Sequence, residues 1–246
     1  MMEKEETIRR KAKLSLVIPV YNEEETVETL LERLLFLAEE FTSVQLVIVD
    51  DGSSDETRDR IRRFLERPKP QNLETTFAAQ ERNQGKGAAL RKGIELCTGE
   101  IIVIQDADLE YDPRDIPRLV QPILDGVADV VYGSRFLGGP HRVLYFWHYV
   151  GNTFLTLLSN MFSNINLTDM ETCYKAFRAE VLKGLRLRED RFGIEVEMTA
   201  KVAKARARIY EIPISYYGRT YEEGKKITWK DGLAAFYHIL RYNLFS

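Results

Sequence analysis

The hydrophobic positions of the chain alternate between short apolar runs and longer segments with helical spacing. Six runs have the length and composition of buried strands: 14–19, 44–49, 75–79, 101–105, 127–132 and 209–216. Between them, apolar residues at three- and four-residue steps, or capping residues, predict helices over 27–38, 53–65, 88–97 and 116–124. Because strands alternate with helices and no Asn-Gly hairpin turn joins them, we expect an α/β fold with a mostly parallel central sheet and helices on both faces.

Capping residues mark the start of two of these helices. Asn22 is expected to cap the first and Ser53 the second, each with a Glu three residues later. No internal repeat, low-complexity tract or linker divides the chain. We therefore expect a single domain over residues 1–246, with a core at about 14–226.

Two further helices are predicted at 140–165 and 229–246. No Asp, Glu, Lys or Arg occurs between Val143 and Thr168. Polar residues there recur at helical steps: His148, Asn152, Thr156, Ser159, Asn160 and Ser163. A wide apolar face with a polar stripe is typical of a helix in a membrane interface, although a helix buried in the protein's own core has the same pattern.

The C-terminal helix also has one apolar face. Its members are Trp229, Leu233, Phe236, Leu240 and Leu244. This face predicts either a lid that packs on the domain or an anchor in a membrane interface.

Composition narrows the class of protein. Hydrophobic residues make up 44% of the 246, enough for a large core. A net charge of −3 and a pI near 5.8 argue against general nucleic-acid binding. The two cysteines, Cys97 and Cys173, have no disulfide or metal-ligand spacing, which fits a reducing compartment, and the three histidines are too scattered for a zinc site. The charged N-terminus has no apolar segment, so we expect no signal peptide.

Two carboxylates, Asp106 and Asp108, follow the apolar run 101–104. Residues two apart on a strand point to the same face, so the two carboxylates are aimed together at the carboxyl end of a buried strand. Close carboxylates repel each other, and a divalent cation with oxygen ligands relieves that repulsion. This spacing predicts a metal site that holds a diphosphate, whereas a simple turn-capping role for the pair is the alternative.

Other nucleotide-binding motifs do not fit the chain. The segment 84–88 contains a Gly-Lys pair, but it lacks the Gly five residues earlier and the Ser or Thr that follows the Lys of a phosphate-binding loop. No G-x-G-x-x-G follows the first predicted strand, and no G-x-S-x-G nucleophile motif occurs. These observations argue against a dinucleotide-binding fold and a serine hydrolase.

An ordered set of motifs resembles the inverting family-2 glycosyltransferases, which have the GT-A fold. The branch it resembles most is that of the polyprenyl-phosphate (dolichol-phosphate) mannosyl- and glucosyltransferases. The matching segments are Ile18–Glu23, Val49–Asp55, Asn83–Gly87, Asp106–Glu110, Gly133–Arg135, Asp169–Thr172, and Arg219 with Gly224–Lys226.

The resemblance implies a role for each matched position on the donor side. The expected nucleotide-binding residues are Pro19, Tyr21, Glu23, Asp50, Asp51, Lys86 and Asp106. The expected ligands of Mg²⁺ or Mn²⁺ are Asp106, Asp108 and Glu110, and the expected diphosphate-binding residues are Arg219, Lys225 and Lys226. Glu110 stands where many mannosyl relatives have Gln, which argues against assuming mannose.

The resemblance also implies roles on the acceptor side. Arg135 and Arg142 are expected to bind an acceptor phosphate, because an arginine fork suits phosphate oxygens. Asp169 stands at the position of the catalytic base, with Glu171 as a less favoured substitute. A phosphate acceptor is already mostly dianionic at neutral pH and needs little help from a base. Glu195 and Glu197 are expected to be structural.

The expected activity is therefore transfer of a hexose from GDP-mannose or UDP-glucose to a polyprenyl phosphate, with inversion to a β-linked product. The protein is expected to be cytoplasmic and peripheral at the inner face of the membrane. One alternative is a family-2 transferase with a hydroxyl acceptor, which needs a true base. Another is a non-catalytic protein that only binds a sugar nucleotide.

Overall fold

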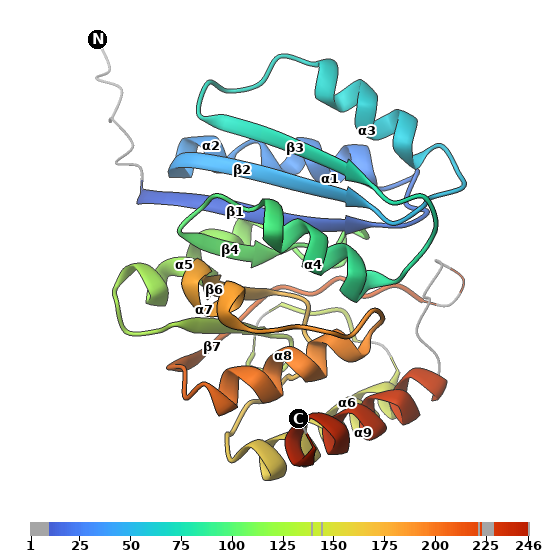
Figure 1. The fold of residues 1–246 in the computed structure, drawn as a ribbon, viewed down its shortest axis with the longest axis vertical. Helices are drawn as coiled ribbons and strands as arrows, with labels where there is room; N and C mark the ends of the chain where they lie inside the picture. Colours follow the sequence, from blue (N-terminus) through green and yellow to red (C-terminus); the bar gives the residue numbers. More distant parts are fainter. Residues whose placement is uncertain (1–9, 139, 144, 221, 223–228, 246) are drawn as a thin grey trace.

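The computed structural model describes residues 10–138, 140–143, 145–220, 222 and 229–245. In these residues one seven-stranded sheet has the order β3-β2-β1-β4-β6-β5-β7 (Figure 1). The strands are β1 (Arg10–Val20), β2 (Phe41–Asp50), β3 (Leu73–Ala79), β4 (Ile101–Ile104), β5 (Val130–Ser134), β6 (Lys175–Arg178) and β7 (Ile209–Pro213). Every pairing is parallel except those of β6, which runs antiparallel between β4 and β5.

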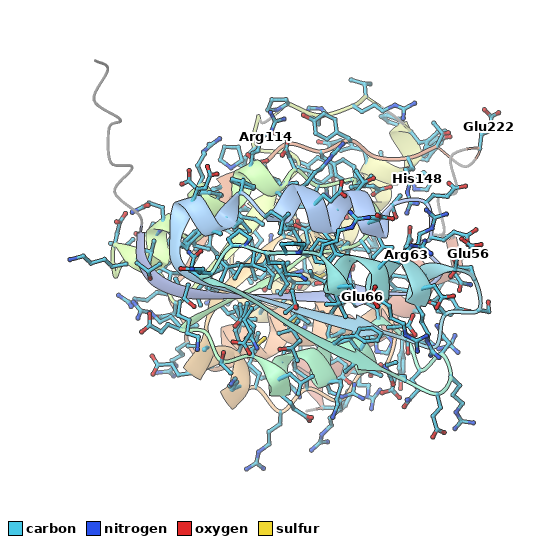
Figure 2. The ribbon with its side chains drawn as sticks, turned by 90° about the horizontal axis from the view of Figure 1, so that it is seen from above. Glu56, Arg63, Glu66, Arg114, His148 and Glu222 are labelled. Carbon is cyan, nitrogen blue, oxygen red and sulfur yellow. The ribbon has the colours of Figure 1, made fainter. Side chains whose placement is uncertain are left out.

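Helices cover both faces of the sheet. They are α1 (Val27–Leu34), α2 (Leu37–Glu40), α3 (Thr57–Glu66), α4 (Lys86–Leu96), α5 (Ile116–Leu124), α6 (Phe146–Ser163), α7 (Ala179–Gly184), α8 (Gly193–Lys204) and α9 (Trp229–Leu244), with a 3₁₀ turn η1 at Pro113–Asp115. In Figure 1, α4 lies in front of the sheet and α1 and α2 lie behind it. Figure 2 marks Glu56, Arg63 and Glu66 along α3, whose charged side faces solvent.

Burial along β2 explains why the central strands contain long apolar runs without strict alternation. Every residue from Val44 to Asp50 is buried. Successive side chains on a strand point to opposite faces, so both faces of β2 are covered. The predicted α/β class with a mostly parallel sheet is confirmed.

Strand β6 and helices α7 and α8 were not among the predicted elements. β6 has only four residues, and its ends are the charged Lys175 and Arg178, so no apolar run marks it. The charges are satisfied inside the fold: Lys175 pairs with Glu195, and Arg178 donates to the carbonyl oxygens of Ala128 and Ile123. A strand whose polar ends have tertiary partners leaves no signal in local hydrophobicity.

The two predicted helix caps are wrong. The first helix begins at Val27 and the third at Thr57, with Thr26 and Glu56 at the capping positions. Asn22 and Ser53 instead join neighbouring loops: the Asn22 amide donates to Ser53 Oγ (3.0 Å), and Asn22 Oδ1 accepts from the amide of Ser54 (2.9 Å). Parallel neighbours β1 and β2 end at the same edge of the sheet, so polar residues there meet across loops. The predicted helix over 27–38 is also interrupted between α1 and α2.

Helices α6 and α9 lie side by side beneath α8 and form a layer outside the sheet (Figure 1). A second small core fills it, made of Met170, Val196, Ala235 and Ile239. The helix predicted at 140–165 is shorter than expected, since the described residues before Phe146 are not helical. Among the described residues, no helix combines the length and the hydropathy needed to cross a bilayer.

Candidate active site

The candidate site residues collect at the carboxyl ends of the parallel strands. Asp50 ends β2, Asp106 follows β4, and Arg135 follows β5. In the view of Figure 2, His148 of α6 and Glu222, beyond β7, lie at this same end of the molecule. Ligands of open α/β sheets bind at this edge, where loops from several strands converge.

Asp108 and Glu110 surround the side chain of Arg219. Arg219 Nη2 lies 3.3 Å from Asp108 Oδ2, and its Nε lies 3.3 Å from Glu110 Oε1. The Arg219 amide donates to Glu110 Oε1 (2.9 Å), and the Tyr216 hydroxyl donates to Glu110 Oε2 (2.7 Å). Leu109, between the two acids, has a φ of +61°, so a left-handed residue turns both carboxylates towards the loop after β7.

Burial, together with the neighbouring charges of Asp106 and Glu110, raises the pKa of Asp108 to about 7, against the opposing effect of Arg219. Asp106 and Asp108 lie beyond β4, which ends at Ile104. The strand alternation that predicted a shared direction for their side chains therefore does not apply to them. Among the described residues no three His, Cys, Asp or Glu side chains already converge as a metal site. The oxygen donors suit a hard cation, but such an ion would have to displace Arg219 from Asp108.

Asp106 pairs with Lys86, the first residue of α4. Lys86 Nζ lies 2.8 Å from Asp106 Oδ1 and 3.1 Å from Glu195 Oε1. The Lys86 side chain is only 15% exposed, and its charge is paired with carboxylates of the protein. Lys86 therefore acts on the site through Asp106.

The paired acids Asp50 and Asp51 are buried and bonded to protein groups. Asp51 accepts from the amides of Gln84 (2.8 Å) and Gly85 (2.7 Å). Asp50 pairs with Arg58 and accepts from the amide of Ser53. Both carboxylates thus fix the loops after β2 and β3.

The other expected nucleotide-binding residues lie at the end of β1 and just beyond it. Tyr21 is 40% exposed, and Pro19 is half-buried. Glu23 accepts from the hydroxyl of Thr26 (2.9 Å) and lies 3.8 Å from Arg219. Glu23 thereby joins the loop after β1 to the acidic cluster.

Arg135 and Asp169 form a two-pronged ion pair. Arg135 Nε and Nη2 lie 2.6 and 2.7 Å from the two oxygens of Asp169, and the Arg135 amide adds a third bond of 3.1 Å. Asn152 of α6 donates to Asp169 Oδ1 (3.3 Å), and the Arg135 guanidinium lies over the Tyr216 ring. Because Asp169 is fully buried and both its oxygens are bonded, it orients Arg135 in this conformation.

The polar stripe of α6 faces the protein. Thr156 accepts from the Met170 amide, Asn160 bonds the backbone of Leu167, and Ser163 bonds Asn243. The apolar side therefore faces outwards. Its exposed members are Trp147 (77%), Val150, Phe154, Leu157 and Met161. Burial of this helix in the protein's own core, the alternative interpretation, is wrong for these residues.

Arg142 precedes α6 and lies beside the loop after β7. It is exposed, its amide donates to the Tyr216 carbonyl (2.9 Å), and its Nη1 donates to the Gly218 carbonyl (3.2 Å). The predicted residues Lys225 and Lys226 lie outside the described residues.

Two charged groups lie near the Arg135–Asp169 ion pair: Glu171, which is half-buried, and Lys175, which is fully buried. Glu171 Oε1 is buried with no hydrogen-bond partner, and burial followed by the charge of Glu195 raises its pKa to about 7. Lys175 is fully buried against Glu195. The Lys175–Glu195 pair could not be predicted from sequence, because its members lie twenty residues apart on elements that no periodicity predicts.

Comparison with known proteins identifies the family of the chain. The family model described as glycosyl transferase family 2 matches residues 15–186. The chain is 28% identical over 213 residues to a dodecaprenyl-phosphate galacturonate synthase of Rhizobium johnstonii, covering 86% of this chain and 61% of that protein. It is 27% identical over 222 residues to a dolichol-phosphate mannosyltransferase of Pyrococcus furiosus, covering 87% of this chain and 59% of the relative. The chain thus spans about three fifths of the length of these relatives.

A solved structure shares the fold. Glucosyl-3-phosphoglycerate synthase from Mycobacterium tuberculosis, in complex with Mn²⁺, UDP and phosphoglyceric acid, superposes with a TM-score of 0.72 at 18% identity. The match covers 96% of this chain and 80% of that one. The fold is therefore GT-A-like, as the sequence motifs predicted. Since the family match covers most of the chain, this protein belongs to glycosyl transferase family 2.

Proposed function

We propose that this protein transfers a hexose from a nucleotide-sugar, GDP-mannose or UDP-glucose, to a polyprenyl phosphate with inversion. The observation that carries the proposal is the pairing of two charged clusters at one sheet edge: Asp108 and Glu110 around Arg219, and Asp169 around Arg135. The names of the relatives, which include transferases specific for dodecaprenyl, undecaprenyl and dolichyl phosphates, support a lipid phosphate as acceptor.

The donor side would hold a nucleoside diphosphate. Asp106, Asp108 and Glu110 have the oxygen ligands that Mg²⁺ or Mn²⁺ prefers. The pKa of Asp108 is raised by burial and then by the negative charges of Asp106 and Glu110, which a cation would offset. Such an ion, when bound, supplies positive charge to the leaving diphosphate. Arg219 would add a second positive group there, which acts most strongly as the sugar–oxygen bond breaks.

The acceptor side would hold a phosphate. Asp169 fixes the plane of the Arg135 guanidinium, which lies over the Tyr216 ring, and Arg142 donates to the carbonyl oxygens of Tyr216 and Gly218. With both oxygens of Asp169 bonded, a pre-ionised phosphate is a better nucleophile for this site than a hydroxyl, which needs a free base. The acceptor phosphate would attack the sugar carbon directly as the diphosphate leaves, which inverts that carbon.

The outer side of α6 would contact the membrane. Its exposed apolar residues form one stripe at three- and four-residue steps, and α6 contains no Asp, Glu, Lys or Arg. On α9, the exposed Leu233, Tyr237 and Leu244 add apolar surface. This surface would place Arg142 at the level of lipid head groups, with the protein peripheral at the cytoplasmic face.

The test is transfer of label between phases. The purified protein is incubated with radiolabelled GDP-mannose, UDP-glucose or UDP-N-acetylglucosamine and Mn²⁺, with and without polyprenyl phosphate, and the mixture is extracted with organic solvent. We expect counts in the organic phase with one of the first two donors only when the lipid is present. Label transferred to a water-soluble glycan would favour a hydroxyl acceptor. Donor binding without transfer or hydrolysis would favour a non-catalytic protein.

A further inference from the structure

Lys86 is held between two carboxylates from different parts of the fold. Its Nζ lies 2.8 and 3.0 Å from the two oxygens of Asp106 and 3.1 Å from Glu195 Oε1. The Glu195 side chain, on the first turn of α8, is only 4% exposed. A lysine shared in this way neutralises neither carboxylate completely.

Backbone packing fixes this arrangement. A Cβ atom at Gly85 or Gly87 would lie 2.3 or 2.2 Å from the carbonyl oxygens of Asp190 and Glu189. The Ala88 amide donates to the Asp190 carbonyl (3.1 Å), so the start of α4 lies directly on the segment before α8. The glycines flanking Lys86 therefore serve this close approach, and the distance from Lys86 to Glu195 does not depend on a flexible loop.

The second oxygen of Glu195 is bonded to Lys175. The Lys175 side chain is fully buried, and its Nζ also donates to the Thr172 carbonyl. Asp106, Lys86, Glu195 and Lys175 thus form a row of alternating charges that reaches from the donor side into the interior. Buried charges are costly unless paired, so each member depends on its neighbours.

We infer that Glu195 is a positioning residue of the donor site, which draws Lys86 partly away from Asp106 and so keeps the Asp106 carboxylate available to a divalent cation. Lys175 in turn prevents Glu195 from taking Lys86 completely. The inference rests on the proposed function, because it assumes that Asp106 binds the cation of the donor diphosphate.

The test measures Mn²⁺ binding without donor, by titration calorimetry, alongside the melting temperature. In Glu195→Gln, Lys86 has Asp106 as its one remaining carboxylate, so we expect Mn²⁺ affinity to fall about 10–100-fold, as for other residues that orient metal ligands. The melting temperature should also fall, because Lys175 loses its partner.

Two further variants separate positioning from folding. Lys175→Met combined with Glu195→Gln removes one charge of each sign, so it should recover the melting temperature but not the Mn²⁺ affinity. Asp129→Asn is the matched control at the opposite end of the sheet. Asp129, just before β5, pairs with Arg208 (2.7 Å) and Arg178 (3.3 Å), so its loss should lower stability and leave Mn²⁺ affinity unchanged.

Wild-type affinity in Glu195→Gln, or recovered affinity in the double variant, would overturn the inference while leaving the proposed function intact. If the wild-type protein bound no Mn²⁺, the inference and the proposed metal site would fail together.

Discussion

Arg219 faces three carboxylates at once. It lies 3.3 Å from both Asp108 and Glu110 and 3.8 Å from Glu23. An arginine in this position compensates the negative charge that a metal ion would otherwise balance. A cation bound at Asp108 would therefore compete with Arg219, and in the proposed reaction Arg219 would meet the diphosphate only after that exchange.

Arg219→Gln should consequently have opposite effects on two ligands. Without the competing guanidinium, Mn²⁺ affinity in the absence of nucleotide should rise several-fold. UDP affinity in the presence of Mn²⁺ should fall by about 1.5–3 kcal/mol, the contribution of a hydrogen bond to a charged group. Calorimetric titrations with each ligand measure both effects, and Arg142→Gln serves as a control that should change neither. A parallel loss of both affinities would show that Arg219 supports the site without competing with the cation.

Glu171 provides a test of pH dependence. Burial raises its pKa from 4.5 to about 7, so between these values the folded protein holds a proton that the unfolded chain has released. The contribution of Glu171 to stability is therefore present below pH 4.5 and is lost as pH rises towards 7. Glu171→Gln mimics the protonated acid, so its free energy of unfolding should exceed that of the wild type by up to about 3 kcal/mol at pH 8 and by little at pH 4.5.

Urea unfolding at several pH values measures this difference. Other groups with raised pKa values, such as Asp108, are common to both proteins and cancel in the comparison. Two stability curves that stay parallel from pH 4.5 to 8 would show that Glu171 ionises normally.

Among the elements, α6 has the helical period that its sequence pattern predicts, but the pattern does not predict which side of the helix faces the protein. The polar stripe predicted from sequence is real, but it faces inwards, where Asn152 bonds Asp169 and Thr156 bonds the backbone of Met170. Polar groups on a helix are satisfied either by water or by protein partners, and sequence periodicity does not distinguish the two. Because the polar residues of α6 bond protein partners, the side of the helix that remains exposed is the apolar one.

The exposed apolar stripe predicts lipid binding. Trp147 and Leu157 are 77% and 66% exposed, so replacing both with Ser should not disturb the core. If these side chains enter the bilayer interface, the double variant should lose about a hundredfold or more in affinity for vesicles of anionic phospholipid, because burial of each contributes about 1.5–3 kcal/mol. Vesicle co-sedimentation measures this loss. Val127→Ser, a similar change at an exposed residue before β5, should bind as the wild type does; equal losses in both variants would argue against a specific surface.

The elements that sequence predicted well are those stabilised by continuous burial. Strands β1, β2 and β4 contain apolar runs because helices cover both faces, and these runs were visible directly in the sequence. Strand β6 and the caps at Asn22 and Ser53 were missed or misassigned because their polar residues bond partners distant in sequence. The candidate site followed the same rule: motif residues such as Asp108 and Arg219 were found, whereas Lys175 and the contact of Lys86 with Glu195 depend on tertiary packing.

At the scale of the whole molecule, the α6–α9 layer is joined to the sheet by specific contacts. Its small core includes Met170, which is adjacent to Asp169, and α9 bonds the segment before α8 through Arg241 and Glu189 (2.7 Å). Lys204 of α8 donates to the Tyr242 carbonyl of α9 (2.7 Å). These links extend from the outer layer to the ion pair of the acceptor side, so we propose that the chain folds as one domain.

The positions of the two tryptophans make this proposal testable. Trp147 lies in α6 and Trp229 begins α9, so tryptophan fluorescence reports on the outer layer, whereas far-UV circular dichroism reports mainly on the rest. In a single cooperative unit, the two signals should change at the same urea concentration. Ile239→Ala opens a cavity in the small core and should lower the free energy of unfolding by about 2–5 kcal/mol. Both midpoints should therefore move together to a lower urea concentration. If fluorescence changed at a lower urea concentration than circular dichroism, and if Ile239→Ala shifted the fluorescence signal alone, the outer layer would be a separate folding unit. Loss of that layer would then remove the hydrogen bond from Asn152 to Asp169 while the donor side stayed folded.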